Sequence, residues 1–315
     1  MMDDALLIHG GAVGDFVMSL RIVAALRETG AGKVTVLGKP EIATIAVPGG
    51  GVDAVIDINQ GGYHSLFSAE PPIPAPVLEI LRRFDLAVDM LGGPRGVVTT
   101  KLREAGIPKV IAFDPRPRSD WTGHISDQWL ADLQAAGIHA VPGPPLIRLS
   151  EERRDQARHR LLATTNSANL GLAVLHPGSG SRQKCWPPTH FAGLAMILQT
   201  RGWGVTFLLG PVETERFTAS ETASLRGAAP MIVGCSLPDA ADLIAAANLF
   251  VGNDSGMSHL AAAIGTPTVA IFGPTNPKVW GPMARHAVII GPGPLGAWPW
   301  IEEVADAVPK GTWSG

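Results

Sequence analysis

Short apolar segments rich in β-branched residues alternate along the chain with longer segments whose apolar positions recur at helical spacing. This alternation is typical of βαβ units, which build parallel sheets. In the first half it predicts strands at Leu6–His9, Val34–Leu37, Ala54–Ile58, Leu86–Asp89 and Val110–Phe113. It predicts helices at Asp15–Glu28, Glu41–Ala46, Ala75–Arg83, Val97–Ala105 and Ile125–Ala136. We therefore expect a doubly wound α/β domain.

A stretch rich in proline and glycine, Val141–Pro145, interrupts this pattern and is expected to be a linker. The pattern restarts with a polar helix at Glu151–Thr164. Thr189 and Ser236 are residue types that cap helix N-termini, and each is followed by a segment of helical period. Strands are expected at Leu172–Leu175, Val205–Leu209, Met231–Val233, Leu249–Val251, Thr268–Phe272 and His286–Ile290.

The end of the chain is expected to hold an irregular connection at Gly291–Pro299 and a helix at Trp300–Val308. The pattern thus predicts two Rossmann-like doubly wound domains, residues 1–145 and 146–315. One arrangement that stays open is that the terminal helix packs back on the N-terminal domain. In such sheets ligands bind beyond the carboxyl ends of the strands, so the turns from strand to helix are where chemistry is expected.

Composition narrows the class of protein. The chain has 315 residues, of which 46% are hydrophobic and 17% charged, and its net charge is −3. These values fit two globular domains and argue against a nucleic-acid partner. Its two cysteines, Cys185 and Cys235, suggest neither a disulfide framework nor a zinc site. No signal peptide or membrane-spanning run is evident, so we expect a cytoplasmic protein whose membrane contact is at most peripheral, at the inner face.

The first candidate turn, His9–Asp15, lacks the spacing of a dinucleotide fingerprint and of a P-loop. It places the carboxylate of Asp15 at a helix start. Two interpretations remain open: Asp15 caps the helix, or it acts as a base or electrostatic stabiliser that the helix end keeps ionised.

The second turn, His176–Pro187, contains small residues that let backbone N–H groups approach an anion, and two cations, Arg182 and Lys184. We favour a solvated surface position for Arg182 and a functional one for Lys184, because Trp186 and Pro187 should fix the backbone behind it.

The third turn, Gly252–His259, leads from a strand into an alanine-rich helix. Free N–H groups near Ser255 and Gly256, together with the helix dipole, predict an anion site. Asp254 is interpreted as a helix cap. His259 lies one turn into the helix and faces either the site or the core. A weaker signal is Glu213 after another strand, as a ribose-binding acid or a first-turn helix residue.

Together these segments resemble glycosyltransferase family nine, the ADP-heptose:lipopolysaccharide heptosyltransferases. The resemblance rests on Gly11–Asp15, His176–Gly178, Lys184–Pro187, Gly252–Ala263, Gly265–Thr275 and Trp280–Pro282. It implies a GT-B fold, in which two Rossmann-like domains face a cleft, and inverting sugar transfer with no cofactor and no metal.

By match to the family motifs, Asp15 would be the base that deprotonates the acceptor hydroxyl, and Lys184 would pair with the diphosphate. The donor, a nucleotide sugar such as ADP-heptose, would be held by Ser255, Gly256, His259 and, at the ribose, Glu213. A lysine and a helix N-terminus can stabilise a leaving diphosphate in place of a divalent ion.

The acceptor implied by the resemblance is a glycolipid or oligosaccharide of the lipopolysaccharide-core type. Arg95 and Lys101, after the fourth strand, are candidates to bind its acidic groups, with solvated surface residues as the alternative. His9 stands where the family usually has an arginine. Other functions stay open: an enzyme for another glycan, a nucleotide-sugar epimerase, or a non-catalytic nucleotide-sugar-binding protein.

Overall fold

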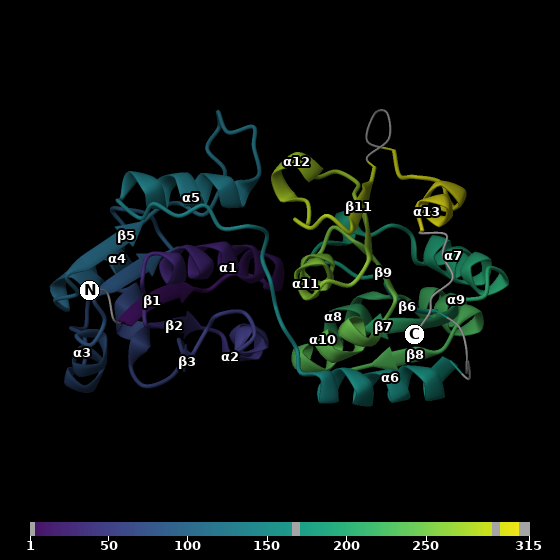
Figure 1. Cartoon of the computed structure of the whole chain (residues 1–315), viewed down its shortest axis with the longest axis horizontal. Helices are drawn as coiled ribbons and strands as arrows, with labels where there is room; N and C mark the ends of the chain where they lie inside the picture. The colour runs from purple at the N-terminus through teal and green to yellow at the C-terminus, as the bar shows by residue number, and fades with distance from the viewer. Residues whose placement is uncertain (1–3, 166–170, 292–296, 309–315) are drawn as a thin grey trace. The chain divides into compact units, whose positions relative to one another are not determined.

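The computed structural model describes residues 4–165, 171–291 and 297–308. The chain divides into two compact units, Met1–Pro145 and Leu146–Gly315, each with its own parallel sheet (Figure 1). This boundary is the one expected from the proline-rich stretch. Residues 292–296 of the expected irregular connection lie outside the described part of the chain.

Unit 1 is built on a five-stranded parallel sheet in the order β3-β2-β1-β4-β5. Its strands are β1 (Asp4–His9), β2 (Lys33–Gly38), β3 (Ala54–Asp57), β4 (Leu86–Asp89) and β5 (Lys109–Ala112). Its helices are α1 (Val13–Glu28), α2 (Pro40–Ala43), η1 (Thr44–Ala46), η2 (Tyr63–Phe67), α3 (Ala75–Leu81), α4 (Val97–Glu104) and α5 (Ile125–Ala135). Every strand and helix predicted in this half is present, and the chain reverses its direction across the sheet between β1 and β4.

Unit 2 is built on a six-stranded parallel sheet in the order β11-β10-β9-β6-β7-β8. Its strands are β6 (Leu172–His176), β7 (Gly204–Leu209), β8 (Met231–Val233), β9 (Leu249–Asn253), β10 (Thr268–Ile271) and β11 (Ala287–Ile290). Its first strand, β6, is central, and β9 lies on its other side. This is the strand order of a dinucleotide-binding Rossmann domain, whose switch point falls between β6 and β9.

The helices of unit 2 depart from the sequence prediction in detail. They are α6 (Glu151–Thr165), η3 (Arg182–Lys184), α7 (Pro188–Thr200), α8 (Pro211–Arg216), α9 (Ala219–Ala228), α10 (Leu237–Ala246), α11 (Gly256–Ile264), α12 (Pro277–Trp280) and α13 (Ile301–Ala307). Ser236 caps α10 as predicted, since its side chain accepts from the N–H of Asp239. The prediction for Thr189 is wrong, because α7 begins at Pro188 and prolines already set its first turn.

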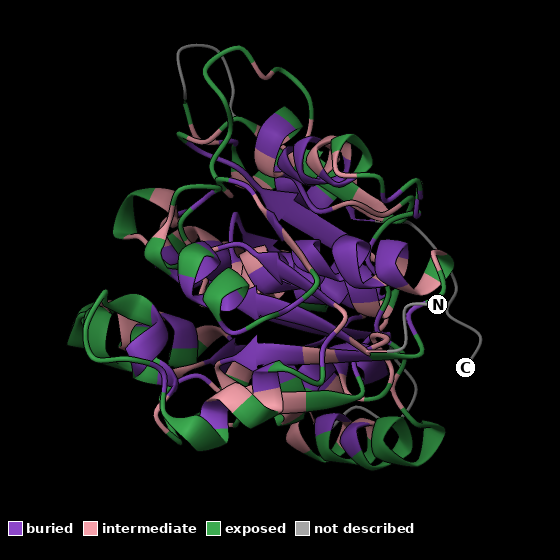
Figure 2. Ribbon diagram, turned by 90° about the vertical axis from the view of Figure 1, so that its left-hand side faces the viewer, coloured by how far each residue is buried: buried purple, intermediate pink, exposed green. Residues whose placement is uncertain are grey.

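The terminal helix α13 belongs to unit 2 and packs in its core. Val304 and Ala305 are fully buried in the core that α7 and β10 also line. Gly193 of α7 makes this packing close, since a Cβ there would lie 2.9 Å from Cδ1 of Ile301. Figure 2 shows buried strands in both sheets, covered by helices that are exposed on their outer faces.

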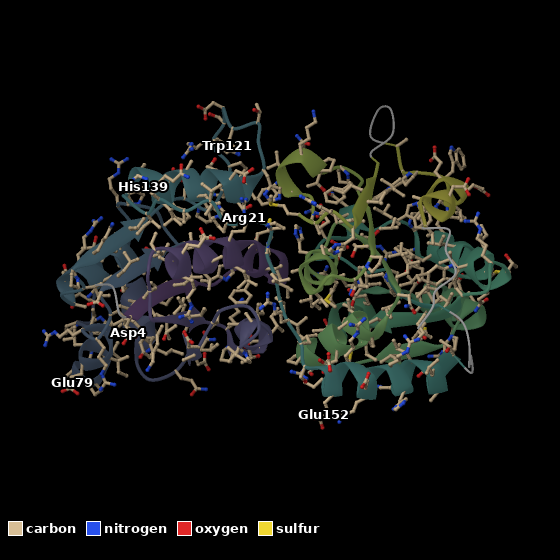
Figure 3. The ribbon with its side chains drawn as sticks, viewed as in Figure 1. Asp4, Arg21, Glu79, Trp121, His139 and Glu152 are labelled. Carbon is tan, nitrogen blue, oxygen red and sulfur yellow. The ribbon has the colours of Figure 1, made fainter. Side chains whose placement is uncertain are left out.

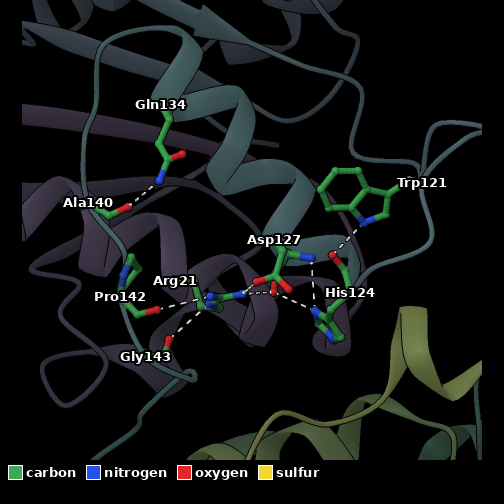
Figure 4. Close-up of polar contacts among 9 residues, drawn as sticks. Arg21, Trp121, His124, Asp127, Gln134, Ala140, Pro142 and Gly143 are labelled. Atoms are coloured by element: carbon green, nitrogen blue, oxygen red, sulfur yellow. Dashed lines mark hydrogen bonds and ion pairs between the residues drawn. The ribbon is translucent and has the colours of Figure 1, made fainter.

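Arg21 ties the start of the linker to unit 1. It lies on α1, below α5, with 6% of its surface exposed (Figure 3). Its guanidinium group donates to Oδ1 of Asp127 on α5 at 2.5 Å, and to the carbonyl oxygens of Pro142 and Gly143 at 3.2 Å (Figure 4). Linker residues up to Gly143 are therefore held on the surface of unit 1.

Candidate functional site

The two turns predicted to bind an anion meet at the switch point of unit 2. β6 and β9 are neighbours in register, with His176 opposite Gly252. The turns that follow them therefore leave the same edge of the sheet. Asn253 joins them: its Oδ1 accepts from the N–H of Trp186 at 2.9 Å, and its Nδ2 donates to the carbonyl oxygen of Pro177 at 2.8 Å. Asn253 is not among the predicted site residues, although a polar residue at the end of an apolar strand was a signal.

Lys184 lies at this junction, as predicted. Its Nζ is 2.9 Å from Oδ2 of Asp254, and the same oxygen accepts a hydrogen bond from the hydroxyl group of Thr275. The side chain of Asp254 is 6% exposed and that of Lys184 is 34% exposed. The interpretation of Asp254 as a helix cap is wrong: α11 has Ser255 as its N-cap residue, and the carboxylate is turned to Lys184 and Thr275 instead.

Ser255 heads α11 without capping it. Its side chain makes no capping hydrogen bond, and its Oγ is buried without a partner among the described residues. The first N–H groups of an α-helix have no partner within the helix, and they carry its positive dipole end. Gly256 opens the helix, and His259, in its first turns, is buried. A helix start with an unpartnered buried hydroxyl group thus lies next to a lysine.

Glu213 lies beside the second turn, on the first turn of α8. Its Oε2 accepts from the N–H of Gly210 at 2.8 Å, so it caps its own helix. It also lies against the backbone of Gly178, where a Cβ would be only 1.8 Å from Oε1 of Glu213. Glycine is required at that position. A small pocket is lined here by Gly178, Ser179, Arg182, Cys185, Val212, Glu213, Arg216 and Phe217.

His176, the last residue of β6, supports this carboxylate. Its Nδ1 accepts from the N–H of Gly178 at 3.1 Å, and its Nε2 is 3.9 Å from Oε2 of Glu213. Burial lowers the pKa of His176, and the negative charge of Glu213 opposes that shift. Because Nδ1 is an acceptor, the proton of the neutral ring is on Nε2, facing Glu213.

Arg182 is engaged at the surface, as the sequence interpretation favoured. Its guanidinium group pairs with Glu221, and its side chain is 49% exposed.

In unit 1, Asp15 lies at the switch point between β1 and β4. It is in the first turn of α1, and its Oδ2 accepts from the N–H of Ala12 at 3.4 Å. A Cβ on Gly11 would lie 3.2 Å from that oxygen and 3.1 Å from Cε1 of His9. The carboxylate and the imidazole thus both approach Gly11. Asp15 contributes to capping α1 through this 3.4 Å contact. Its role as a base stays a prediction.

The two cations proposed for the acceptor differ in environment. Arg95 is exposed on the turn before α4. Lys101 is only 7% exposed, and its Nζ donates to the carbonyl oxygens of Ala69 at 2.8 Å and Pro71 at 3.2 Å. This geometry contradicts the interpretation of Lys101 as a solvated surface residue, because its ammonium group holds the 69–71 loop; its contact with an acceptor stays a prediction.

The described residues contain no group of three or more His, Cys, Asp or Glu side chains arranged to hold a metal ion. None of their helices combines the length and the apolar character that a bilayer crossing demands.

Comparison with known proteins agrees with this geometry. The sequence model of glycosyltransferase family 9 (heptosyltransferase) matches residues 118–304. Lipooligosaccharide heptosyltransferase 2 of Haemophilus influenzae is 38% identical over 112 residues, 34% of this chain and 32% of that protein. Lipopolysaccharide heptosyltransferase 3 of Escherichia coli is 30% identical over 230 residues, 67% of this chain and 66% of that protein. The chain is thus aligned with only about a third of the first relative's length.

Among solved structures, the family 9 glycosyltransferase of Veillonella parvula superposes with a TM-score of 0.77 at 20% identity, covering 97% of this chain and 96% of that one. The two parallel-sheet units and this likeness define a GT-B glycosyltransferase fold. The chain belongs to glycosyltransferase family 9, the heptosyltransferase family.

Proposed function

We propose that the protein is an inverting glycosyltransferase that moves a heptose from ADP-heptose to an acceptor of the lipopolysaccharide-core type. The observation that carries the proposal is the start of α11. There the buried Oγ of Ser255 has no partner among the described residues, and Lys184 stands next to it, paired with Asp254. A helix N-terminus, a hydroxyl group and an ammonium group together suit a diphosphate.

The donor is proposed to lie along the carboxyl edge of the sheet of unit 2. Its diphosphate would take hydrogen bonds from Ser255 and the N–H of Gly256, with His259 nearby, and its ribose would reach Glu213. As the sugar leaves, negative charge develops on the diphosphate, and Lys184 and the helix dipole would stabilise it. No divalent ion is needed for this step.

Asp15 is proposed to be the general base. Its position in the first turn of α1 favours the ionised carboxylate, which would take the proton from the acceptor hydroxyl as that oxygen attacks the anomeric carbon. The new glycosidic bond forms on the face opposite the leaving diphosphate, so the configuration inverts. The same proposal places the protein in the cytoplasm. It would reach the inner face of the membrane through a glycolipid acceptor.

A transfer assay tests the proposal. The protein would be incubated with ADP-heptose and lipopolysaccharide-core acceptors, with chelator present, and release of ADP measured. We expect acceptor-dependent release that is lost in Asp15→Asn, while binding of ADP to that variant stays normal. Ser255→Ala should weaken ADP binding instead.

Tight ADP-heptose binding without any acceptor-dependent release would refute the transferase and favour a binding protein. Conversion of the nucleotide sugar without an acceptor would indicate an epimerase, and preference for another donor would indicate another glycan.

A further inference from the structure

Lys39 lies at the carboxyl edge of the sheet in unit 1 and is not among the predicted site residues. It directly follows Gly38, the last residue of β2, and Gly38 pairs in register with His9, the last residue of β1. The turn after β2 therefore leaves the same edge as the turn that carries Asp15. Both belong to the region where open α/β sheets bind ligands.

The two turns are in close contact at Gly38. A Cβ there would lie 2.7 Å from the carbonyl oxygen of His9, so only glycine lets the backbones approach this closely. The positive charge of Lys39 is near enough to act on the imidazole. Burial, and secondarily this charge, lower the pKa of His9 to about 4, so the ring is neutral near pH 7.

The ammonium group of Lys39 has no hydrogen-bond or ion-pair partner among the described residues. The residue is half-buried. Among the residues that the structure describes, no carboxylate pairs with it and no carbonyl oxygen accepts from its Nζ, in contrast to Lys101 and Lys184. Its positive charge opposes protonation of His9. A half-buried ammonium group at the carboxyl edge of a parallel sheet, with no partner among the described residues, is placed to bind an anion there.

We propose that Lys39 binds an anionic group of the acceptor, a carboxylate or a phosphate, next to the hydroxyl group that Asp15 deprotonates. This inference rests on the proposed transferase function and adds a determinant of acceptor choice. A lysine ammonium can donate to the oxygens of either anion. Because the neighbouring ring of His9 is neutral, Lys39 is the one of the two that would carry the positive charge opposite the anion.

His9 serves as a reporter for the first test, which needs no donor. Its imidazole signal would be followed by NMR in the full chain during pH titration, and assigned by its loss in His9→Asn. The probes are inorganic phosphate, glucuronate and uncharged glucose. A bound anion should raise the pKa of His9 by about one unit. Lys39→Met should raise this pKa without any probe and abolish the response to the anions.

Lys33→Met is the matched control, because Lys33 is an exposed lysine at the opposite end of the same strand. It should respond as the wild type does. A response to phosphate alone or to glucuronate alone identifies the anion. No response to either anion in the wild type, or an equal response in Lys39→Met, overturns the proposal.

The second test is kinetic. In Lys39→Met the KM for an anionic acceptor should rise about tenfold or more, while the Kd for ADP stays unchanged. An unchanged KM would remove the Lys39 site and leave the transferase standing. If the wild type transferred no sugar, the proposed function would be refuted. The NMR response would still decide whether Lys39 binds anions.

Discussion

Lys184 and Asp254, which lie far apart in the sequence, form an ion pair with 2.9 Å between Nζ and Oδ2. Asp254 is buried and also accepts from Thr275, so it is the fixed member of the pair. Lys184 is about one-third exposed. The carboxylate therefore holds an accessible ammonium group next to the start of α11.

The first prediction concerns Lys184→Met. It removes the only proposed side-chain cation of the diphosphate site and leaves the negative charge of Asp254 unbalanced, so the Kd for ADP should rise about 10- to 100-fold. Isothermal titration calorimetry measures it. Lys278→Met, on an exposed lysine of α12, is the control and should bind normally. Equal affinities in the two variants would exclude the role of Lys184.

The second prediction concerns Gly178→Ala. The added Cβ would lie 1.8 Å from Oε1 of Glu213, so the carboxylate must leave its place beside Gly210 and His176. We expect a loss of about 1–3 kcal/mol in the free energy of unfolding and weaker ADP binding. Chemical denaturation and calorimetry measure these two effects.

Gly180→Ala is the matched control on the same turn, because a Cβ there meets nothing within 4 Å. A double-mutant cycle sharpens the test. In the Glu213→Ala background, Gly178→Ala should cost much less, since the clashing carboxylate is gone. An undiminished cost would mean that the strain lies elsewhere.

The fold could be predicted from the sequence because it depends on periodicity. Buried parallel strands are continuous apolar runs, and the helices between them repeat their apolar positions, so strands such as Leu86–Asp89 were placed without error. Short helices in polar segments carry weak periodicity: α9 was not predicted, and α8 was considered only as one interpretation of Glu213. The packing of α13 on α7 depends on tertiary contacts, which no local pattern encodes.

The candidate site could be predicted in part, because its anchors are turn residues with a local signature. The turns holding Lys184 and Ser255 were both found, and the structure places them together. The partners of individual charges were not predictable. Asp254 looks like a cap in sequence but faces Lys184, and Lys101 looks like a surface cation but bonds to backbone carbonyls of a distant loop.

The third prediction is a pH dependence that arises from His9. Its folded-state pKa of about 4 is below its ordinary value of 6.5. The unfolded chain therefore binds more protons between these values, and stability is lost as pH falls from about 6.5 towards 4. The full loss is about 3 kcal/mol. Denaturation of wild type and His9→Phe from pH 4 to 7 should give a smaller slope for the variant.

The contribution of His176 is present in both proteins and cancels in this comparison. Identical slopes in the wild type and the variant would show that His9 does not titrate with folding.

The last prediction concerns the anchor of the linker. Arg21→Met keeps the apolar stem but removes the guanidinium donors to Asp127, to Ser126 and to the carbonyl oxygens of Pro142 and Gly143. We expect a loss of about 2–3 kcal/mol in the free energy of unfolding, because some of these acceptors are buried. The freed linker should also be cut faster by thermolysin before Leu146, an exposed apolar residue.

Arg116→Met is the control. Arg116 pairs with Asp114 at 2.8 Å, but its side chain is 83% exposed, so solvent screens the pair and its loss should leave stability almost unchanged. Arg21→Lys should lie between the two, since a single ammonium group cannot reach Asp127 and both linker carbonyl oxygens at once. If Arg21→Met proved as stable and as protease-resistant as Arg116→Met, the linker would be held by its prolines rather than by this arginine.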